Sequence, residues 1–354
     1  MSRAGAALAR TWYSRRSTPV AALLNPLAWI FGAAAALRRA GYRNNLLKRT
    51  RVGVPVIVVG NITIGGSGKT PLVAALVRAL AARGRHPGIV SRGHGRRTRD
   101  TRGVRAGDHP DEVGDEPLLL AATGAPVVVG RDRVAAARLL LATHPDVDVV
   151  VADDGLQHYA LARDVEIAVV DAARGLGNER LLPAGPLREP ASRLDSVDAL
   201  VWRTAAGVRP RMRAHAHEFV VDYEPASWIN LVDPARGFDC TWLADRANVA
   251  IAGIGNPDAF FDGLRAQGFA GSTHAFPDHH RYTRDDVAFP GASAVLMTEK
   301  DAVKCRAFGD ARMWMLPIDA RIDPALVDLV LEKIDGPEAA RNAGLSGDEG
   351  SADL

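Results

Sequence analysis

The stretch VGNITIGGSGKTP at residues 59–71 constrains the fold more than any other part of the chain. It ends in GKT, as phosphate-binding P-loops do, but the P-loop pattern G-x-x-x-x-G-K-[ST] requires glycine where this chain has Thr63. The apolar run VPVIVVG at 54–60 predicts a buried strand before the turn, and leucines at positions 72, 76 and 80 predict a helix after it. A strand, a glycine turn and a helix in this order favour a nucleotide site over the alternative of a bare glycine turn.

A nucleotide site here would use the backbone of the loop and two side chains. Successive N–H groups and the start of the following helix would point at phosphate oxygens, Lys69 would supply positive charge, and Thr70 would offer its hydroxyl to Mg²⁺. Pro71 fits the first helical turn, because its missing N–H has no partner inside the helix there. The predicted ATP-binding residues are Thr63, Ile64, Gly65, Gly66, Ser67, Gly68, Lys69 and Thr70.

A second motif supplies carboxylates for a metal ion. VDVVVADDGLQH at 147–158 is typical of an apolar strand that ends in Asp153 and Asp154. In P-loop enzymes such a strand lies beside the loop and brings its terminal aspartate to Mg²⁺, directly or through water. Two adjacent carboxylates repel each other unless a cation lies between them, which favours a metal site over a solvated turn. Thr70, Asp153 and Asp154 are therefore the predicted metal ligands.

The rest of the chain alternates short apolar runs with helical stretches, as in a parallel sheet with helices on its faces. We expect an α/β fold, with a P-loop NTPase-like core over 51–207 and a smaller α/β domain over 233–335. Two extended, half-exposed segments within 208–232 predict a linker between them. The polar end at 336–354 predicts a disordered tail.

The first 50 residues combine basic and apolar character. Of the 44 Lys and Arg residues, 18 precede Asp100, the first acidic residue, which suggests an anionic partner. Residues 19–37 carry no charge and are flanked by pairs of arginines, so we expect a membrane-associating helical segment over 1–50. A buried helix pair and a true membrane span are the alternatives, and the alanine-rich composition counts against a span.

Five motifs in order resemble those of one family. The loop, DDGLQH at 153–158, LLPAGPLREP at 181–190, PDHH at 277–280 and TEKDAVK at 298–304 are similar to motifs of the tetraacyldisaccharide 4′-kinases. That family also has threonine at the start of the loop and proline after GKT. The resemblance implies transfer of the γ-phosphate of ATP to the 4′-hydroxyl of a tetra-acylated glucosamine disaccharide 1-phosphate, giving lipid IVA.

The resemblance has further implications for fold, cofactors and location. It implies two α/β domains joined by a two-stranded linker, with ATP and Mg²⁺ as cofactors. It also implies an enzyme at the cytoplasmic face of the bacterial inner membrane, held there peripherally or by an N-terminal anchor. A lipid with four acyl chains stays in the bilayer, so an apolar N-terminal segment would bring the active site to its substrate.

The resemblance also assigns roles to single residues. Asp115 matches the catalytic base, His279 the histidine that couples with it, and Lys69 the phosphate ligand, while His280 is held in reserve for the histidine. Without the resemblance, Asp115 would be interpreted as a solvated loop carboxylate and Asp278-His279 as a surface turn. An aspartate is a weak base toward an alcohol, and a neighbouring histidine can orient it and share the proton. The expected substrate-binding residues are Glu116, Gln157, His158, Arg188 and Glu189.

Other functions remain as alternatives, including a kinase with a different acceptor. A P-loop GTPase or metallochaperone would need [NT]-K-x-D after a strand, whereas SAVLMTEKD at 293–301 has its lysine one position too late. A nucleic-acid-binding ATPase is disfavoured, because aromatic content is only 6% and the first arginines bracket an apolar segment. A non-catalytic membrane scaffold would leave the loop and the paired aspartates unexplained. We therefore expect a lipid substrate and a membrane surface as partners, and no nucleic acid.

Overall fold

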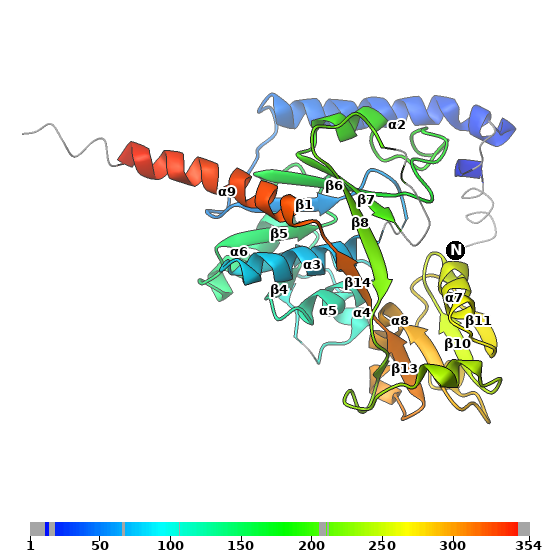
Figure 1. Cartoon of the computed structure of the whole chain (residues 1–354). Coiled ribbons are helices and arrows are strands. Elements are labelled where there is room, and N and C mark those ends of the chain that lie inside the picture. The colour runs from blue at the N-terminus through cyan, green and yellow to red at the C-terminus, as the bar shows by residue number, and fades with distance from the viewer. Residues whose placement is uncertain are drawn as a thin grey trace, which may run out of the picture.

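The computed structural model describes residues 11–13, 18–65, 68–105, 107–204, 210 and 212–345, with the backbone alone for Cys240 and residues 337–345. This part of the chain forms two domains, each built on its own mostly parallel β-sheet (Figure 1). The predicted α/β fold class is confirmed.

The larger domain contains nine strands in the order β14-β8-β7-β6-β1-β5-β2-β4-β3. Among the described strands of this sheet, β3 and β14 alone run antiparallel to their neighbours. β1 lies between β5 and β6, so the loop after β1 and the aspartates that end β5 emerge side by side. The strands are β1 (Val56–Gly60), β2 (Pro87–Ser91), β3 (Arg102–Gly103), β4 (Val127–Val129), β5 (Val149–Asp153), β6 (Val165–Asp171), β7 (Ala199–Thr204), β8 (Glu218–Pro225) and β14 (Ile318–Arg321).

Helices cover both faces of this sheet. On one face lie α3 (Lys69–Ala82), α5 (Asp115–Ala121) and α9 (Pro324–Leu345), which bury leucine and valine side chains against the strands. On the other face lie α6 (Arg133–Thr143) and the loops after β5 and β6. All residues of β1, β2 and β5 are buried, as expected for parallel strands that are covered on both faces. The short helix α4 (Pro110–Val113) precedes α5.

The smaller domain has five strands in the order β11-β10-β12-β13-β9, with β9 antiparallel to β13. α7 (Pro257–Ala266) covers one face of this sheet, and α8 (Glu299–Cys305) covers the other. The strands are β9 (Ile229–Asn230), β10 (Val249–Ala252), β11 (Ser272–Ala275), β12 (Val295–Thr298) and β13 (Met313–Leu316).

The chain crosses between the domains twice, and the second crossing differs from our expectation. β14 pairs with β8 in the larger sheet, and α9 buries Leu326, Val330 and Ile334 there, at helical spacing. Residues from 318 onward therefore belong to the larger domain and not to the smaller domain expected over 233–335. α9 also extends to Leu345, beyond the expected start of the disordered tail at 336, and residues 346–354 lie outside the described residues.

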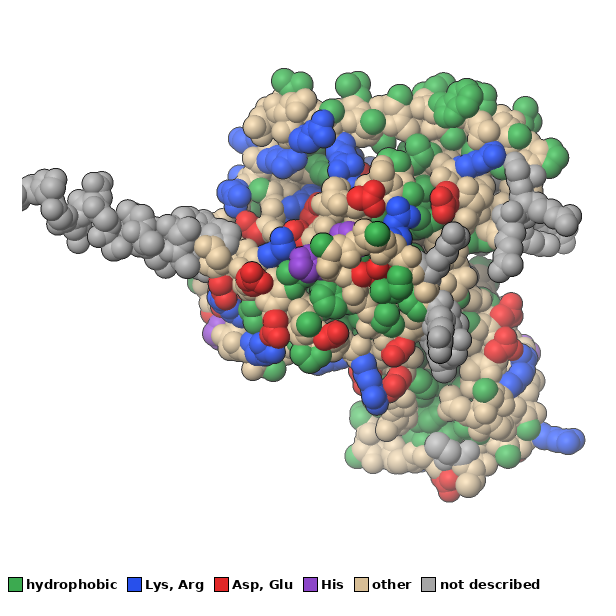
Figure 2. Space-filling view, turned by 45° about the horizontal axis from the view of Figure 1, so that its top comes forward, with side chains coloured by type: hydrophobic (Ala, Val, Ile, Leu, Met, Phe, Trp, Pro, Cys, Tyr) green, Lys and Arg blue, Asp and Glu red, His purple; other side chains and the backbone are tan. Residues whose placement is uncertain are grey.

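In the described part of the N-terminal segment, residues 19–43 form one long helix, α2 (Pro19–Arg43). Only 11% of its apolar stretch is buried, so the alternative of a helix pair buried in the core is wrong. Thr18 caps the helix by accepting from the N–H of Ala21, and the helix continues through Pro26. It is long and apolar enough to cross a membrane. Its outer side carries exposed Val20, Leu23, Leu27, Trp29, Ile30 and Leu37, and Figure 2 shows hydrophobic side chains standing outward along it.

Candidate active site

The start of the phosphate loop is an extended segment instead of a glycine turn. Thr63 forms an antiparallel bridge with Leu187, and the N–H of Ile64 donates to the carbonyl of Pro186 over 2.7 Å. Extended backbone is open to any residue type, so position 63 does not need glycine. This pairing gives a physical reason for the threonine that departs from the P-loop pattern.

Asn61 connects the loop to its lysine, and we did not predict it as a site residue. Its buried side chain donates to Thr63 Oγ1 over 3.1 Å and accepts from Lys69 Nζ over 3.2 Å. The lysine is thus held in place before any nucleotide binds. The only local signal at Asn61 is an N-x-T sequon, which points to a different function.

The glycines of the loop occupy the backbone conformations that need them. Gly65 and Gly68 have φ values of 98° and 71°, which favour glycine. A Cβ atom at Gly68 would lie 2.8 Å from Cδ of Arg203, and the hydroxyl of Tyr223 donates to the Gly68 carbonyl. α3 begins directly after it at Lys69. The predicted loop residues Gly66 and Ser67 lie outside the described residues.

Asp153 and Asp154 lie beside the loop, at the end of β5. Asp153 is 2% exposed and accepts from Ser91 Oγ over 3.0 Å. Asp154 forms ion pairs with Lys69 Nζ at 3.2 Å and with an Arg188 nitrogen at 3.3 Å. Burial opposes ionisation of Asp154, but the charges and hydrogen bonds of Lys69 and Arg188 outweigh it and lower its pKa.

Asp153 and Thr70 fit the requirements of a magnesium ion. Burial and then the charge of Glu116 raise the pKa of Asp153. None of the ion pairs formed within the described ranges involves Asp153. A buried carboxylate that lacks an ion-pair partner offers the oxygen donors that Mg²⁺ prefers, and Thr70 brings a hydroxyl to the first turn of α3.

Asp115 and His279 come together from the two domains. Oδ2 of Asp115 lies 3.0 Å from Nδ1 of His279. Asp115 begins α5 and is 4% exposed, whereas His279 follows β11 and has a left-handed φ of 58°. His280 lies 3.3 Å from Asp286 instead. The structure therefore brings His279, and not the reserve candidate His280, to the expected base.

Neighbouring charges keep Asp115 ionised. Burial alone would raise the pKa of Asp115, but the hydrogen bond from His279 and the charge of Lys300 lower it to about 2. The same hydrogen bond raises the pKa of His279, against the effect of burial. An ionised carboxylate can only accept hydrogen bonds, so Nδ1 of His279 carries the shared proton.

Lys300 is a further site residue that sequence analysis did not single out. Its Nζ lies 3.4 Å from Glu116 Oε1, 3.4 Å from His279 Nε2 and 3.8 Å from Asp278 Oδ1. Lys300 lies near the N-terminus of α8, so it connects the smaller domain to the start of α5. Its position in the motif TEKDAVK was the available signal, but that motif does not say what the lysine contacts.

The remaining expected substrate residues differ in their surroundings. Arg188 donates to Asp154 and to Gln157 Oε1, and both Arg188 and Gln157 stay partly exposed beside the loop. Glu189 is 4% exposed and accepts from Gln157 and from the hydroxyl of Tyr159. Glu189 is therefore oriented inward, where it supports Gln157.

His158 also has a supporting position. Its Nε2 accepts from the backbone N–H of Arg133 over 3.2 Å, at the start of α6. Burial, followed by the charge of Arg133, lowers the pKa of His158 to about 4, so the ring is neutral. The structure thus places His158 against α6 and not among the side chains that surround Lys69.

A cavity of about 210 Å³ opens between the domains beside the Asp115–His279 pair. Its walls include His94, Arg97, Asp111, Asp115, His279 and Arg281. Arg97 and Arg281 reach Asp111 from the two sides at 3.1 and 2.9 Å. Asp115 and its partner His279 thus line the same interdomain cavity.

Comparison with known proteins identifies the family. The model of the family described as tetraacyldisaccharide-1-P 4′-kinase, LpxK, matches residues 20–335. The chain belongs to the tetraacyldisaccharide 4′-kinase family. The family resemblance, the kinase class and the function predicted from the sequence are confirmed.

Individual relatives support this at high coverage. A tetraacyldisaccharide 4′-kinase of Azoarcus sp. is 50% identical, with 91% of this chain and 94% of the relative aligned. One from Dechloromonas aromatica is 48% identical, with 94% and 98% aligned. A crystal structure of LpxK from Aquifex aeolicus in complex with ATP is 29% identical, with a TM-score of 0.77 over 89% of this chain and 99% of that one.

Proposed function

We propose that the protein transfers the γ-phosphoryl group of ATP to the 4′-hydroxyl of tetraacyl-glucosamine-disaccharide 1-phosphate, with Asp115 as the base. The observation that carries the assignment of the base is the 3.0 Å contact between Asp115 and His279, at an interdomain cavity. The charge of Glu116, the neighbour of Asp115, also acts on Asp153 at the phosphate loop, so the base and the nucleotide site are close enough to interact electrostatically.

In this mechanism Asp115 accepts the proton of the attacking hydroxyl. The hydroxyl oxygen forms a bond to the γ-phosphorus, the bond from that phosphorus to the bridging oxygen breaks, and ADP leaves. His279 donates to the carboxylate from Nδ1, which fixes its orientation, and Lys300 balances the negative charge of Asp115, Glu116 and Asp278. Most of the acceleration in phosphoryl transfer comes from such positioning and charge neutralisation.

ATP would lie along the loop from Thr63 to Thr70. Lys69 would exchange part of its contact with Asp154 for phosphate oxygens, and Arg188 stands beside it to balance the same negative charge. Thr70 and Asp153 would hold Mg²⁺, with Asp154 in the next layer. When bound, Mg²⁺ neutralises charge on the β- and γ-phosphates.

The reaction is tested by phosphate transfer from labelled ATP to the tetra-acylated lipid in detergent micelles. Asp115→Asn should reduce kcat by about 10²–10⁴-fold, the usual contribution of a general base, while ATP binding is retained. Asp285→Asn, an exposed carboxylate of the smaller domain, is the matched control and should behave as the unmodified protein. Full turnover by Asp115→Asn would refute the base, and no lipid product from the unmodified protein would refute the acceptor.

We further infer that the outer side of α2 docks on the membrane that holds the lipid substrate, at the cytoplasmic face of the inner membrane. Support comes from the exposure of Leu23 at 81%, Trp29 at 72% and Ile30 at 67%, which would be unfavourable in water. Trp12, which precedes α2, is held by the protein, because its indole N–H donates to the carbonyl of Pro183 over 3.0 Å.

A vesicle flotation assay tests the docking of α2. Leu23→Glu with Ile30→Glu should abolish flotation with phosphatidylcholine vesicles, because charged side chains disfavour the apolar layer. Since both residues are exposed, folding should be preserved, and activity in detergent micelles provides the control. Flotation that is undiminished in the variant would contradict docking through α2.

A further inference from the structure

We propose that a pocket under the C-terminal end of α2 binds the phosphate group of an anionic membrane phospholipid. The pocket has a volume of about 250 Å³ and lies between α2, the loop before β6 and η1 (Ala191–Ser196). Its basic lining residues are Arg39, Arg43, Arg49, Arg163 and Arg193. This volume lies below the roughly 300–1,000 Å³ of sites for drug-sized ligands, and therefore suits a head group instead of a whole lipid.

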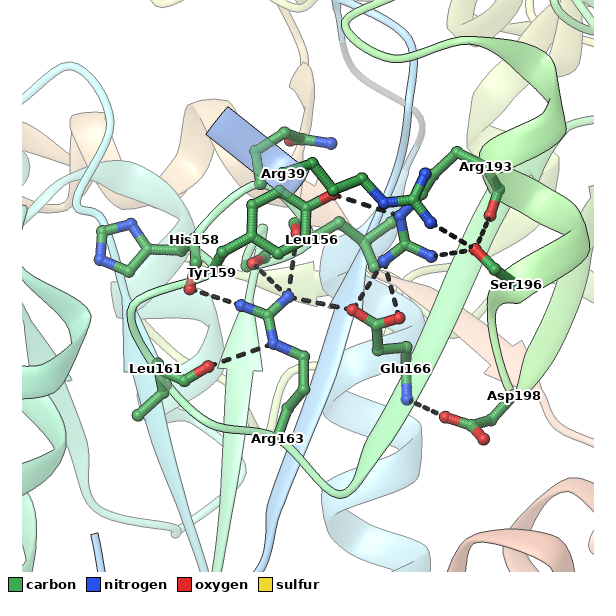
Figure 3. Close-up of polar contacts among 12 residues, drawn as sticks. Arg39, Leu156, His158, Tyr159, Leu161, Arg163, Glu166, Arg193, Ser196 and Asp198 are labelled. Atoms are coloured by element: carbon green, nitrogen blue, oxygen red, sulfur yellow. Dashed lines mark hydrogen bonds and ion pairs between the residues drawn. The ribbon is translucent and has the colours of Figure 1, made fainter. Parts of the chain in front are cut away.

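The acidic residues of the pocket are already engaged. Glu166 is 2.6 Å from Arg193 and 3.1 Å from Arg163, and Figure 3 shows both guanidinium groups converging on it. Asp198 forms an ion pair with Lys333 at 2.7 Å and accepts from the N–H of Glu166. Asp164, the third acidic lining residue, is 3.1 Å from Arg51. The carboxylates are thus neutralised without the three N-terminal arginines.

Arg39, Arg43 and Arg49 keep their positive charge available. Arg39 donates to the neutral hydroxyl of Ser196 over 3.0 Å. Among the described residues, Arg43 and Arg49 form no hydrogen bond or ion pair with the protein. Guanidinium groups match phosphate oxygens with paired donors, so three of them around one pocket favour a phosphate ligand.

Local structure holds these arginines in place. Arg39 and Arg43 are four residues apart on α2, and therefore lie on one side of the helix. Arg49 precedes Thr50, whose N–H donates to Ala160 and whose carbonyl accepts from Ala162. The returning segment after α2 is thus fixed against the pocket wall, and Arg49 lines the same cavity as the two helix arginines.

The pocket would lie at the same depth as the head groups of a bilayer when α2 docks on the membrane, so this argument rests on the docking proposed above. Ala21, Ala28, Arg39 and Arg43 recur at spacings that place them on the side of α2 facing the protein. The exposed apolar side chains lie on the other side, and Figure 2 shows Lys and Arg side chains gathered beneath one end of the helix. An interfacial helix sinks about 5–10 Å and is about 10 Å wide, so the pocket would lie at the level of lipid phosphates.

Flotation of the full chain with two kinds of vesicle tests this proposal. Vesicles contain phosphatidylcholine alone or an equimolar mixture with phosphatidylglycerol. The unmodified protein should bind the mixture more tightly, and Arg43→Ala with Arg49→Ala should lose about 30-fold of that affinity, at about 1 kcal/mol per arginine. Arg246→Ala with Arg265→Ala, two exposed arginines of the smaller domain, is the matched control and should bind as the unmodified protein.

Two further arms separate a phospholipid pocket from diffuse charge attraction and from a site for the substrate. Arg43→Lys with Arg49→Lys keeps the charge but removes the paired donors, so it should also lose affinity for the mixture. Binding of this lysine variant at the unmodified level would overturn the proposal in favour of diffuse attraction. A kinase assay in micelles distinguishes the lipid source: an unchanged KM in the alanine variant supports a bilayer phospholipid, and a raised KM would assign the pocket to the 1-phosphate of the substrate.

Discussion

Asp115 illustrates how single residues are tuned by groups from both domains. As the first residue of α5 it lies at the positive end of a helix, and His279 and Lys300 reach it from the smaller domain. Its low pKa means that it is ionised at every pH above about 4, so its own titration does not limit activity near neutrality. That ionisation depends on partners that can be removed one at a time.

Replacing His279 should change the pH dependence of the reaction as well as its rate. Burial raises the pKa of Asp115 and the hydrogen bond from His279 opposes it, so His279→Ala should shift that pKa upward. The acidic limb of the kcat/KM profile should then move to higher pH. His280→Ala, at a ring that contacts Asp286, should leave the limb in place. A fall in rate with an unmoved limb would show that His279 acts only by orientation.

Replacing Lys300 should also weaken catalysis. Burial alone would lower the pKa of this lysine, but the charges of Glu116, Asp115 and Asp278 outweigh that effect, and the net shift is upward. Lys300 is therefore charged at neutral pH. Lys300→Met would leave three carboxylates without their shared cation, and we expect kcat/KM to fall by about tenfold or more, which corresponds to roughly 1.4 kcal/mol. Lys48→Met, an exposed lysine after α2, is the control. Activity that equals that of the control would exclude an electrostatic role.

At the scale of elements, the phosphate loop and its flanking strand and helix are the best example of local prediction. The strand, the helix and the positive-φ glycines are each encoded by a short stretch of sequence, and all three are present in the structure. The pairing of Thr63 with Leu187 and the contact of Asn61 with Lys69 involve partners whose identity no local pattern encodes. For this reason the sequence predicted that the loop binds phosphate but not how it is held.

The conformation of Gly68 should be essential to nucleotide binding. An alanine there would be strained at a φ of 71°, and its Cβ would crowd Arg203. The strain of about 1–2 kcal/mol should weaken ATP binding by about tenfold, as measured by isothermal titration calorimetry. Gly263→Ala in α7 is the control, because a Cβ meets nothing within 4 Å there and alanine favours the helix. Unchanged ATP affinity in Gly68→Ala would mean that the loop relaxes freely.

At the scale of the whole molecule, the two crossings of the chain determine which domain each segment stabilises. Hydrophobic periodicity predicted two α/β units, but it could not predict that the last strand and helix return to the first one. Strand β14 contributes only Ile318–Arg321, and its partner β8 lies about a hundred residues earlier, so the sequence carries little information on their pairing. α8, which carries Lys300, lies between these two connections in the chain.

This topology predicts which β-sheet should lose protection from hydrogen exchange when a substitution in α9 creates a cavity. Leu326 is fully buried against the larger sheet, so Leu326→Ala should cost about 2–5 kcal/mol of stability. Hydrogen–deuterium exchange should then rise in β1, β6 and β8, while β10 and β12 stay protected. Phe261→Ala in α7 is the matched cavity variant of the smaller domain and should give the opposite pattern. Faster exchange in β10 and β12 of Leu326→Ala would instead assign α9 to the smaller domain, because a cavity weakens first the sheet whose core it opens.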